Sequence, residues 1–479
     1  MLSGGRSGIV SSCSAVAPMA SHLFPDDPAC DPNVEQLSAP TRPVGRGTPR
    51  IRKPVRQQIK MQELSLDELL DPDHPARIVW AAACQFNLQP WLDEIKAVEG
   101  DVGRDGTDPR LLLSLWLLAT LDGVTSGREL TRLCTTHRAY EWLCGEVTVN
   151  YHLINDFRSG GGEKWKQLLS DIVGSLLNEG LVTLDRVAQD GMRVRADAGK
   201  SSFRREETLE DHLARARQKV EELEALRDDP DNTLTKREYA ARKRAARERE
   251  QRVQEAINVC HTLQADREEL VDKRKKPPKP PRASTTDPEA QIMKFANGGY
   301  DPGVNVQFST DTQTGIIMGT EVVSSGSDQL QLVPMLKQIQ EEHGQVPNEA
   351  TLDGGYGSLE QIETATDMGC TVYIPPREEQ KQLENGKDPY AQKRGDSPAI
   401  AAWRARMGTE LGKAIYKLRC QTAEWVNARC RNWGLRQMPV RGLEKCGIIA
   451  VLYAITNNVL VAGTLRAAAS AAKLAAEGC

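Results

Sequence analysis

A highly charged segment near the middle of the chain interrupts a pattern of short apolar strands. Glu, Arg and Lys dominate residues 205–275, with a pause at residues 228–232 (DDPDN). This pattern predicts two antiparallel charged helices joined by a turn. The stretch Lys273–Arg282 that closes the segment is too rich in proline to be helical. Because strand signals lie on both sides of the segment, the sheet must be built from parts of the chain that are far apart in sequence.

The strand signals define an α/β pattern around this insert. Before it, the apolar residues of 182–196 alternate with arginines around Asp190 and Gly191, as one bent strand or as two strands joined by a turn. After it, we expect strands at 304–309, 315–319, 350–352 and 370–374, and helices at 329–343, from 358, at 399–433 and at 446–460. The order β-β-β-α-β-α-β-α predicts an α/β core with one helical insert.

Two further regions precede the core. Residues 1–60 are rich in Pro, Ser and Gly and predict a disordered arm. Within it Arg42–Lys60 is a basic stretch without acids, which can neutralise phosphates or serve only as a flexible leader. Residues 61–180 predict short helices, including the apolar Leu111–Leu121, as in a helix-turn-helix or any small helical bundle. The predicted organisation is a disordered basic arm (1–60), a helical DNA-binding domain (61–180), the core (181–204 and 283–462), an inserted helical hairpin and basic linker (205–282) and a tail (463–479).

Composition argues against a membrane or secreted protein. The longest apolar runs, Leu111–Leu121 and Gly447–Ile455, are shorter than the roughly 18–20 residues that span a bilayer. The 11 cysteines include no CxxC pair, which favours reduced thiols in a cytoplasmic protein. The formal net charge of −4 neither requires nor excludes a nucleic-acid partner.

Three acidic residues stand at or beside predicted core elements. Asp190 follows the first apolar strand run, Asp353 follows the strand at 350–352, and Glu424 lies on the late helix. If the two strands are neighbours and the helix packs across their ends, the three carboxylates converge. Converging carboxylates repel one another unless cations neutralise them, and hard oxygen ligands suit Mg²⁺. Two such ions about 4 Å apart can activate a water or a 3′-hydroxyl for an in-line phosphoryl displacement.

Each acid also has a purely structural interpretation. Asp190 with Gly191 forms a common hairpin-turn pair. Asp353 precedes two glycines and can cap the turn or helix that follows. Glu424 alone fits a solvated helix face.

Basic and aromatic residues accompany Glu424 on its helix. At 100° per residue, Tyr416 and Arg419 lie about 60° apart, and Glu424 and Arg431 differ by only about 20°. An acid and an arginine two turns apart on one stripe suit a metal ligand beside phosphate contacts. A surface stripe of mixed charge is the alternative.

These residues lie within a series of ordered motifs that resembles the DDE transposases of bacterial insertion sequences. The similar subgroup has an amino-terminal helical domain and a charged insert after the first aspartate. The resemblance runs from about residue 60 to 462. Its motifs are VAQDGMRVRADAG (187–199), STTDPEAQIMKFANGGYDPGVNVQFSTD (284–311), SGSDQLQLVPML (325–336), LDGGYGS (352–358) and YKLRCQTAEWVNARCRNWGLRQMPVRGLEK (416–445).

The resemblance implies an RNase H-like fold, in which helices flank a mixed sheet. It implies that Asp190, Asp353 and Glu424 bind two Mg²⁺ ions, for which Mn²⁺ can substitute. Tyr416, Arg419, Glu424 and Arg431 look like the family's Tyr-Arg-Glu-Lys signature, with arginine in the place of the lysine. The implied DNA-binding residues are Tyr416, Arg419, Arg431 and Arg441.

The implied activity is metal-dependent cleavage of DNA at terminal inverted repeats and strand transfer into target DNA. The partners would be double-stranded DNA and a second copy of the chain, in the bacterial cytoplasm and associated with the nucleoid. A catalytically inactive DNA-binding protein descended from a transposase is one alternative. A structural protein built on the charged hairpin is another.

Overall fold

A curled six-stranded mixed sheet organises the part of the chain that carries the three acids. The computed structural model describes residues 65–98, 105–226, 234–269 and 279–477, so the predicted basic arm lies outside the described residues. The strand order is β4-β5-β1-β7-β8, with β6 pairing to β5. The strands are β1 (Arg186–Arg195), β4 (Gln291–Lys294), β5 (Tyr300–Asp311), β6 (Ile317–Val323), β7 (Glu349–Leu352) and β8 (Thr371–Tyr373).

The structure of β1 decides whether Asp190 and Gly191 lie in one bent strand or in a turn between two strands. Both residues lie inside one continuous strand, where Asp190 pairs with Phe308 and Gly191 with Gln307 of the antiparallel β5. The hairpin-turn interpretation is therefore wrong. Gly191 is needed here for a different reason, because a Cβ at this position would clash with the carboxylate of Asp328. The strands expected at 304–309 and 315–319 correspond to β5 and β6, which are antiparallel neighbours.

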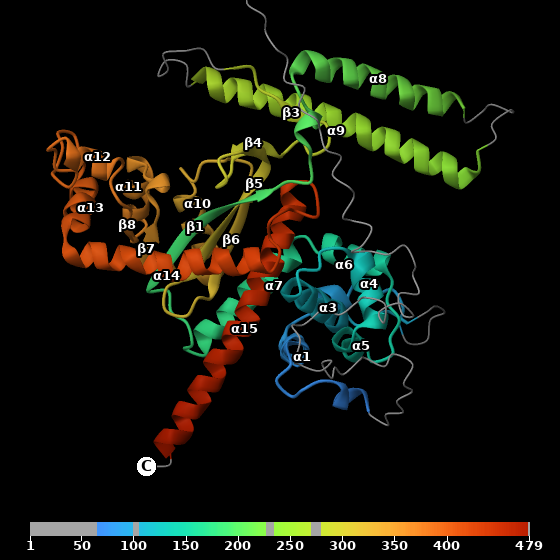
Figure 1. Ribbon diagram of the computed structural model, residues 1–479, viewed down its shortest axis with the longest axis horizontal. Coiled ribbons are helices and arrows are strands. Elements are labelled where there is room, and N and C mark those ends of the chain that lie inside the picture. Colours follow the sequence, from blue (N-terminus) through green and yellow to red (C-terminus); the bar gives the residue numbers. More distant parts are fainter. Residues whose placement is uncertain (1–64, 99–104, 227–233, 270–278, 478–479) are drawn as a thin grey trace, which may run out of the picture. The chain divides into compact units, whose positions relative to one another are not determined.

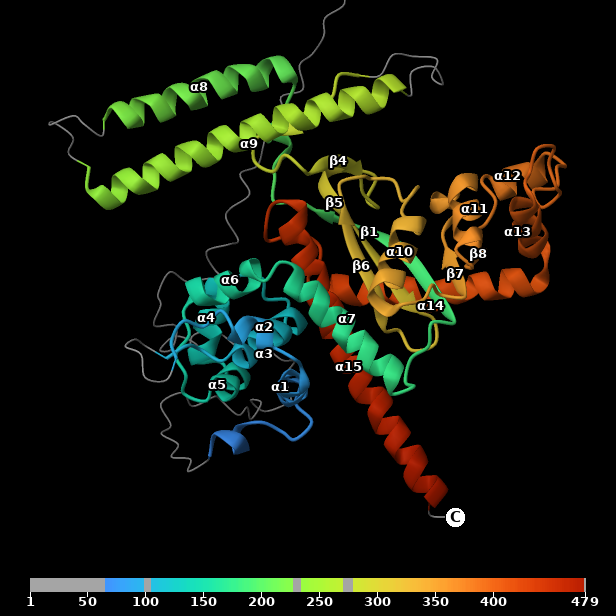
Figure 2. The ribbon, with the colours of Figure 1, turned by 180° about the vertical axis from the view of Figure 1, so that it is seen from behind.

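Helices cover both faces of the sheet. α14 (Glu410–Asn432) packs against β1, β5 and β7 on one face, and α10 (Leu332–His343) packs against β6 on the other (Figures 1 and 2). Side chains of successive strand residues point to opposite faces. Asp190 therefore faces α14, whereas Gln189 and Gly191 face the side of α10.

The helix predicted at 399–433 is two helices. α13 (Pro398–Gly408) ends before Thr409, whose hydroxyl accepts a hydrogen bond from the backbone N–H of Gly412 and caps α14. The remaining helices of this part of the chain are α11 (Leu359–Asp367) and the short α12 (Glu379–Glu384), and α12 is not among the helices expected from the sequence. The break at Thr409 allows α14 to cross the sheet in a direction independent of α13.

The last helix is longer than the sequence indicates. α15 (Leu443–Glu477) continues through the alanine-rich segment after residue 462, which consists of strong helix formers. Its Leu443–Ala475 portion is long and apolar enough to cross a membrane, but 72% of its most apolar window is buried in the protein. α15 packs against β6 and against α3 and α7, so here it acts as a core helix.

The amino-terminal helices share one hydrophobic core with the sheet and α15. Leu111–Leu121 forms the buried α3 as predicted, and Ser126 and Asn150 cap the following helices α4 and α6. The helices are α1 (Pro75–Gln85), α2 (Gln89–Leu92), α3 (Pro109–Leu121), α4 (Gly127–Thr136), α5 (Arg138–Cys144), α6 (Tyr151–Gly160) and α7 (Glu163–Asn178). Because Trp116, Phe308 and Tyr453 belong to the same buried cluster, the predicted boundary at residue 180 is not a break in packing.

The charged insert forms the predicted helical hairpin. α8 (Glu206–Ala225) packs along α9 (Lys236–Glu269), and the two are connected to the sheet through a small ribbon of β2 (Phe203–Arg204) and β3 (Ala283–Ser284) (Figure 1). The hairpin has its own small core, which includes Leu209, Val253 and Ile257 and is separate from the main one. The hairpin is therefore a self-contained unit inserted between β1 and β4.

Candidate active site

A cavity lies along the open edge of β1, where its parallel neighbour ends. β7 pairs with β1 only as far as Gln189, and the segment after α14 pairs with β1 again at Arg195 through Gln437. Between these points the edge of β1 faces a cavity of about 840 Å³. Its lining includes the acids Asp190, Asp328 and Asp353 and the basic residues Arg193, Arg195, Lys294, Arg431 and Arg436. An acidic centre surrounded by basic side chains suits a phosphodiester backbone whose reacting phosphate lies at the acids.

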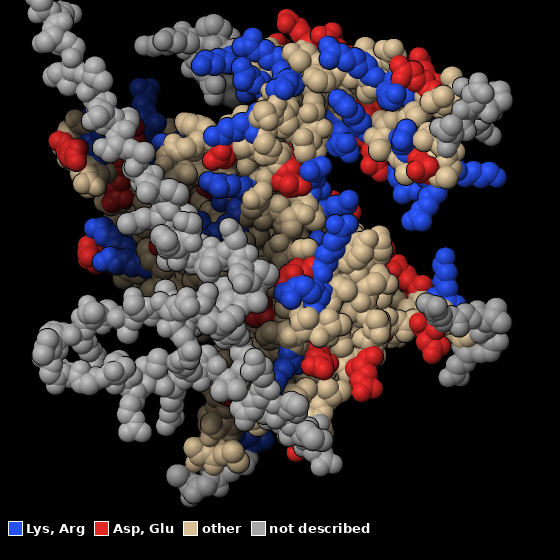
Figure 3. Space-filling model, turned by 45° about the vertical axis from the view of Figure 1, so that its right-hand side comes forward, with Lys and Arg blue, Asp and Glu red and all other residues tan. Residues whose placement is uncertain are grey.

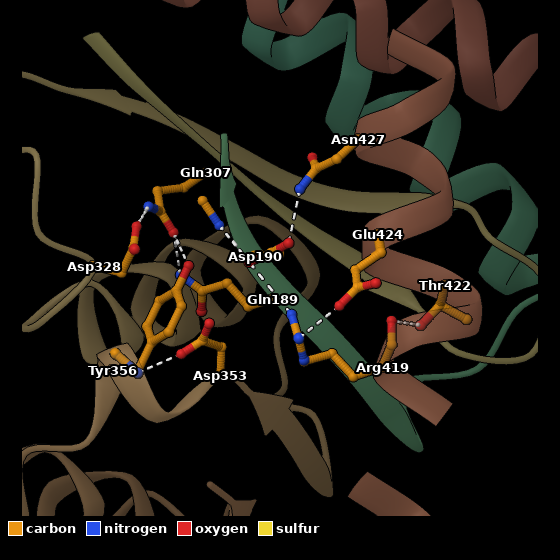
Figure 4. Close-up of polar contacts among 12 residues, drawn as sticks. Gln189, Asp190, Gln307, Asp328, Asp353, Tyr356, Arg419, Thr422, Glu424 and Asn427 are labelled. Atoms are coloured by element: carbon orange, nitrogen blue, oxygen red, sulfur yellow. Dashed lines mark hydrogen bonds and ion pairs between the residues drawn. The ribbon is translucent and has the colours of Figure 1, made fainter. Parts of the chain in front are cut away.

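Asp190 is a largely buried carboxylate on the α14 face of the sheet. One of its oxygens accepts a hydrogen bond from Nδ2 of Asn427 at 3.0 Å, and the other lies 3.5 Å from a guanidinium nitrogen of Arg419 (Figure 4). Burial raises the pKa of Asp190 to about 6, against the lowering effect of Arg419 and with a further rise from Asp353 and Asp328. A cation beside this carboxylate would relieve the cost of its burial.

Asp353 is positioned by the turn that ends β7. It caps the short helix η5 (Gly354–Tyr356), where its side chain accepts a hydrogen bond from the backbone N–H of Gly355. The capping interpretation from the sequence is thus confirmed, but it does not replace the functional one, because Asp353 lines the same cavity as Asp190. The strands that position them, β1 and β7, are parallel neighbours, which meets the condition that the sequence analysis set for their convergence.

Glu424 approaches this centre only through Arg419. The buried guanidinium of Arg419 binds Oε1 of Glu424 at 2.7 Å and also faces Asp190 (Figure 4). The side chain of Glu424 is 50% exposed and is not among the residues that line the cavity. Arg419 therefore occupies a position between two members of the predicted triad.

The remaining predicted DNA contacts have different surroundings. Arg431 is exposed and lines the cavity, whereas Arg419 is 8% exposed and engaged with carboxylates. Tyr416 is half-buried, with the guanidinium of Arg419 5.9 Å from its ring centre. Arg441 lies away from the cavity lining and donates to the Asp197 carboxylate at 2.8 Å.

A buried polar network on the α10 face supports the aspartates, and the sequence analysis did not assign it a role. Tyr356 donates from its hydroxyl to Oε1 of Gln307, which also accepts from Gln189 at 3.2 Å. Gln307 and Asn305 in turn donate to Oδ1 of Asp328 at 2.8 and 2.7 Å (Figure 4). The network thus links the turn of Asp353 to β5 and β1 behind the cavity.

Two signals in the sequence pointed toward the missed residues. Asp328 lies within the motif SGSDQLQLVPML, and Asn427 lies three residues after Glu424, which is one turn of helix. Neither position identifies its partner, because Asp328 meets Asn305 and Asn427 meets Asp190 only after the sheet has formed.

The donors present at the cavity fit a divalent cation in part. Asp190 and Asp353 supply hard oxygen ligands at the cavity, and the buried Oδ1 atoms of Asn305 and Asn427, which do not line it, have no hydrogen-bond partner among the described residues. Among the residues that the structure describes, however, no three Asp, Glu, His or Cys side chains are gathered closely enough to hold a metal. Glu424, the third member of the predicted triad, completes such a set only if its carboxylate leaves Arg419 and binds the cation instead.

Comparison with known proteins matches two regions of the chain to family models. Residues 257–458 match the family model described as a transposase DDE domain, and residues 64–160 match one described as a transposase domain (DUF772). Together the two matches include more than half of the chain. No curated protein and no solved structure matches the chain.

Proposed function

The chain belongs to the DDE transposases, enzymes that cut DNA and transfer its strands during transposition, and from this premise we propose that Asp190, Asp353 and Glu424 are its catalytic acids. The observation that carries the proposal is the pair of aspartates on adjacent strands beside one basic-rimmed cavity. The family matches favour the active enzyme over the inactive DNA-binding alternative, for which they give no support.

We propose that the three carboxylates hold Mg²⁺, two ions by analogy with the family, and that Mn²⁺ can substitute. When bound, these ions would activate the attacking oxygen and stabilise the leaving oxygen. Asp190 and Asp353 would hold the ions from the cavity that both residues line, and Glu424 would have to leave Arg419 to contribute its carboxylate.

Arg419 has a matching role in this proposal. Its guanidinium loses two carboxylate partners once a cation takes its place beside Asp190 and Glu424. An arginine buried beside a cavity without a carboxylate partner is a strong donor for a phosphate oxygen. Arg431, together with Arg193 and Arg436, lines the cavity and would bind the neighbouring phosphates, while Tyr416 supports Arg419 from behind.

DNA is the partner on which the family acts, and the finer partners are proposals. We infer that the chain cleaves the terminal inverted repeats of its own element and works as a homodimer, since two ends must be joined in one reaction. We also propose the predicted organisation of arm, helical DNA-binding domain, catalytic core and insert, and a cytoplasmic location at the nucleoid, where the substrate lies.

Cleavage of a labelled duplex that ends in the element's repeat tests the catalytic assignment. Purified protein should nick this duplex with Mg²⁺ or Mn²⁺ and lose the activity on addition of a chelator. Glu424→Gln should abolish nicking, whereas Glu410→Gln should retain it, because Glu410 lies on the same helix but pairs only with Lys413. Normal nicking by Glu424→Gln would show that Glu424 is not one of the catalytic acids and that another acid takes its role.

A further inference from the structure

The helical hairpin α8–α9 carries its charge unevenly around its surface. On one side of α9, Lys243 and Arg247 both pair with Glu224 of α8, at 3.0 and 2.7 Å. Each of these two cations therefore has a carboxylate partner across the helix pair, although the single charge of Glu224 is shared between them.

Another face of α9 carries arginines that have no such partner. Arg242 and Arg249 are exposed, and neither forms an ion pair within the part of the chain that the structure describes. Seven residues separate them, so they lie within about 20° of each other on the helix and about 10 Å apart along it. They form one stripe, turned by more than 90° from Lys243 and Arg247.

Two arginines from other elements act on the same neighbouring group as Arg249. His212 of α8 has a lowered pKa, first because of burial and then because of the positive charges of Arg215, Arg204 and Arg249, while Asp211 acts in the opposite direction. The three arginines come from α8, β2 and α9, and like Arg242 they form no ion pair among the described residues. Asp211 of α8 and Glu238 of α9 offset part of this positive charge, and an anion bound among the arginines would reduce the repulsion that remains.

We propose that this arginine face, defined as Arg204, Arg215, Arg242 and Arg249, is a docking surface for the phosphate backbone of double-stranded DNA. The inference rests on the proposed function, which makes duplex DNA the substrate, and it adds a binding surface outside the catalytic cavity. Guanidinium groups bind phosphates through paired hydrogen bonds. A duplex presents one phosphate charge per about 1.7 Å of its axis, so a row of arginines along a helix meets phosphates at several points. Figure 3 shows how frequent Lys and Arg side chains are over the hairpin.

The separate core of the hairpin makes this surface testable in the full-length protein. The four arginines lie outside the cluster formed by Leu209, Val253 and Ile257, so their substitution leaves the packing of the hairpin intact. Lys243 and Arg247 provide a matched control, because they stand on the same helix and carry the same charge but are paired with Glu224.

The experiment is a titration of a labelled duplex carrying the repeat end, by fluorescence anisotropy, with a chelator present and at several salt concentrations. Arg242→Gln/Arg249→Gln should bind roughly tenfold more weakly than the parent protein near physiological salt. Its slope of log affinity against log salt should be smaller by about 1.8, since each lost phosphate contact removes about 0.9. Lys243→Gln/Arg247→Gln, with the same change in net charge, should bind like the parent.

The outcomes separate this inference from the proposed function. Equal weakening of both double variants would show a general charge effect and overturn the docking surface. Parent-like binding and slope for Arg242→Gln/Arg249→Gln would also overturn it, while metal-dependent nicking could still stand. If the parent protein failed to bind any duplex, both the inference and the proposed function would fall.

Discussion

The cavity on β1 and the hairpin α8–α9 are both rich in charge, but they use it in opposite ways. In the cavity, a few partly buried acids are held by a sheet and a polar network. Burial raises the pKa of Asp190 to about 6. On the hairpin the charges are far more numerous but exposed, and those that are satisfied pair across the two helices.

This contrast shows that burial, more than the number of charges, gives a group unusual chemistry. A buried carboxylate gains much from a cation because water cannot neutralise it. Exposed arginines retain their ordinary properties and act by displacing counterions from DNA. Substitutions in the cavity should therefore affect the chemical step most strongly, and substitutions on the hairpin should affect affinity.

The largest effect is expected from Asp353→Asn. Loss of one of the three aspartate carboxylates that line the cavity should lower the rate of nicking by about a thousandfold or more, because the amide cannot neutralise a cation. Duplex affinity, measured by anisotropy with a chelator, should remain within about twofold of the parent because phosphate contacts dominate affinity. An Asp353→Asn variant that nicked at the parental rate would contradict the view that the cavity carries the chemical step while the hairpin contributes affinity.

A smaller effect, a gain in stability, is expected from Asp190→Asn. Because the folded-state pKa of Asp190 is about 6 and its usual value is 3.8, folding favours the protonated carboxyl. The stabilising contribution of this group is fully present below pH 3.8 and is lost as the pH rises through 6. Asp190→Asn should therefore raise the free energy of unfolding of the metal-free protein by roughly 2–3 kcal/mol at pH 7.5, and the gain should vanish near pH 4.

Urea unfolding at several pH values measures this gain. Asp301→Asn is the control, because a hydrogen bond from Lys200 holds the pKa of Asp301 below its usual value, so this variant should gain no stability at neutral pH. A constant loss of stability for Asp190→Asn across the pH range would contradict the account of a destabilised buried carboxylate.

The smallest effect is expected from a substitution in the polar network behind the cavity. Tyr356→Phe removes the hydroxyl that donates to Gln307 and should cost about 1 kcal/mol of stability. It should also slow nicking roughly tenfold, since the network that orients Asp353 loses one contact. Tyr300→Phe, at a tyrosine that is 59% exposed, should change neither quantity. Equal behaviour of the two variants would remove the network from the positioning of Asp353.

Local patterns in the sequence predicted the elements and their order, but not every boundary or contact. The hairpin, the antiparallel pair β5–β6 and the strand preceding Asp353 follow from periodicity and turn residues, which act over a few positions. The missed strand β4 is short and is defined by its pairing with β5. The break at Thr409 had a local signal in its capping hydroxyl, but the apolar residues on both sides concealed it.

The sequence identified candidate residues of the site, but it did not predict how all of them are arranged in space. Asp190 and Asp353 line the same cavity because β7 ends beside the middle of β1, with which it pairs in parallel as far as Gln189. The position of Arg419 between Asp190 and Glu424 depends on how α14 lies across the sheet, a contact between residues more than 200 positions apart. No local sequence pattern predicts a contact between residues so far apart in the chain.

Anomalous diffraction from crystals grown with Mn²⁺ tests the central claim most directly. The account predicts a Mn²⁺ peak at the edge of β1, with carboxylate oxygens of Asp190, Asp353 and Glu424 at roughly 2.2 Å and Arg419 displaced from both acids. A structure in saturating Mn²⁺ with no peak between Asp190 and Asp353, and with Glu424 still bound to Arg419, would contradict it.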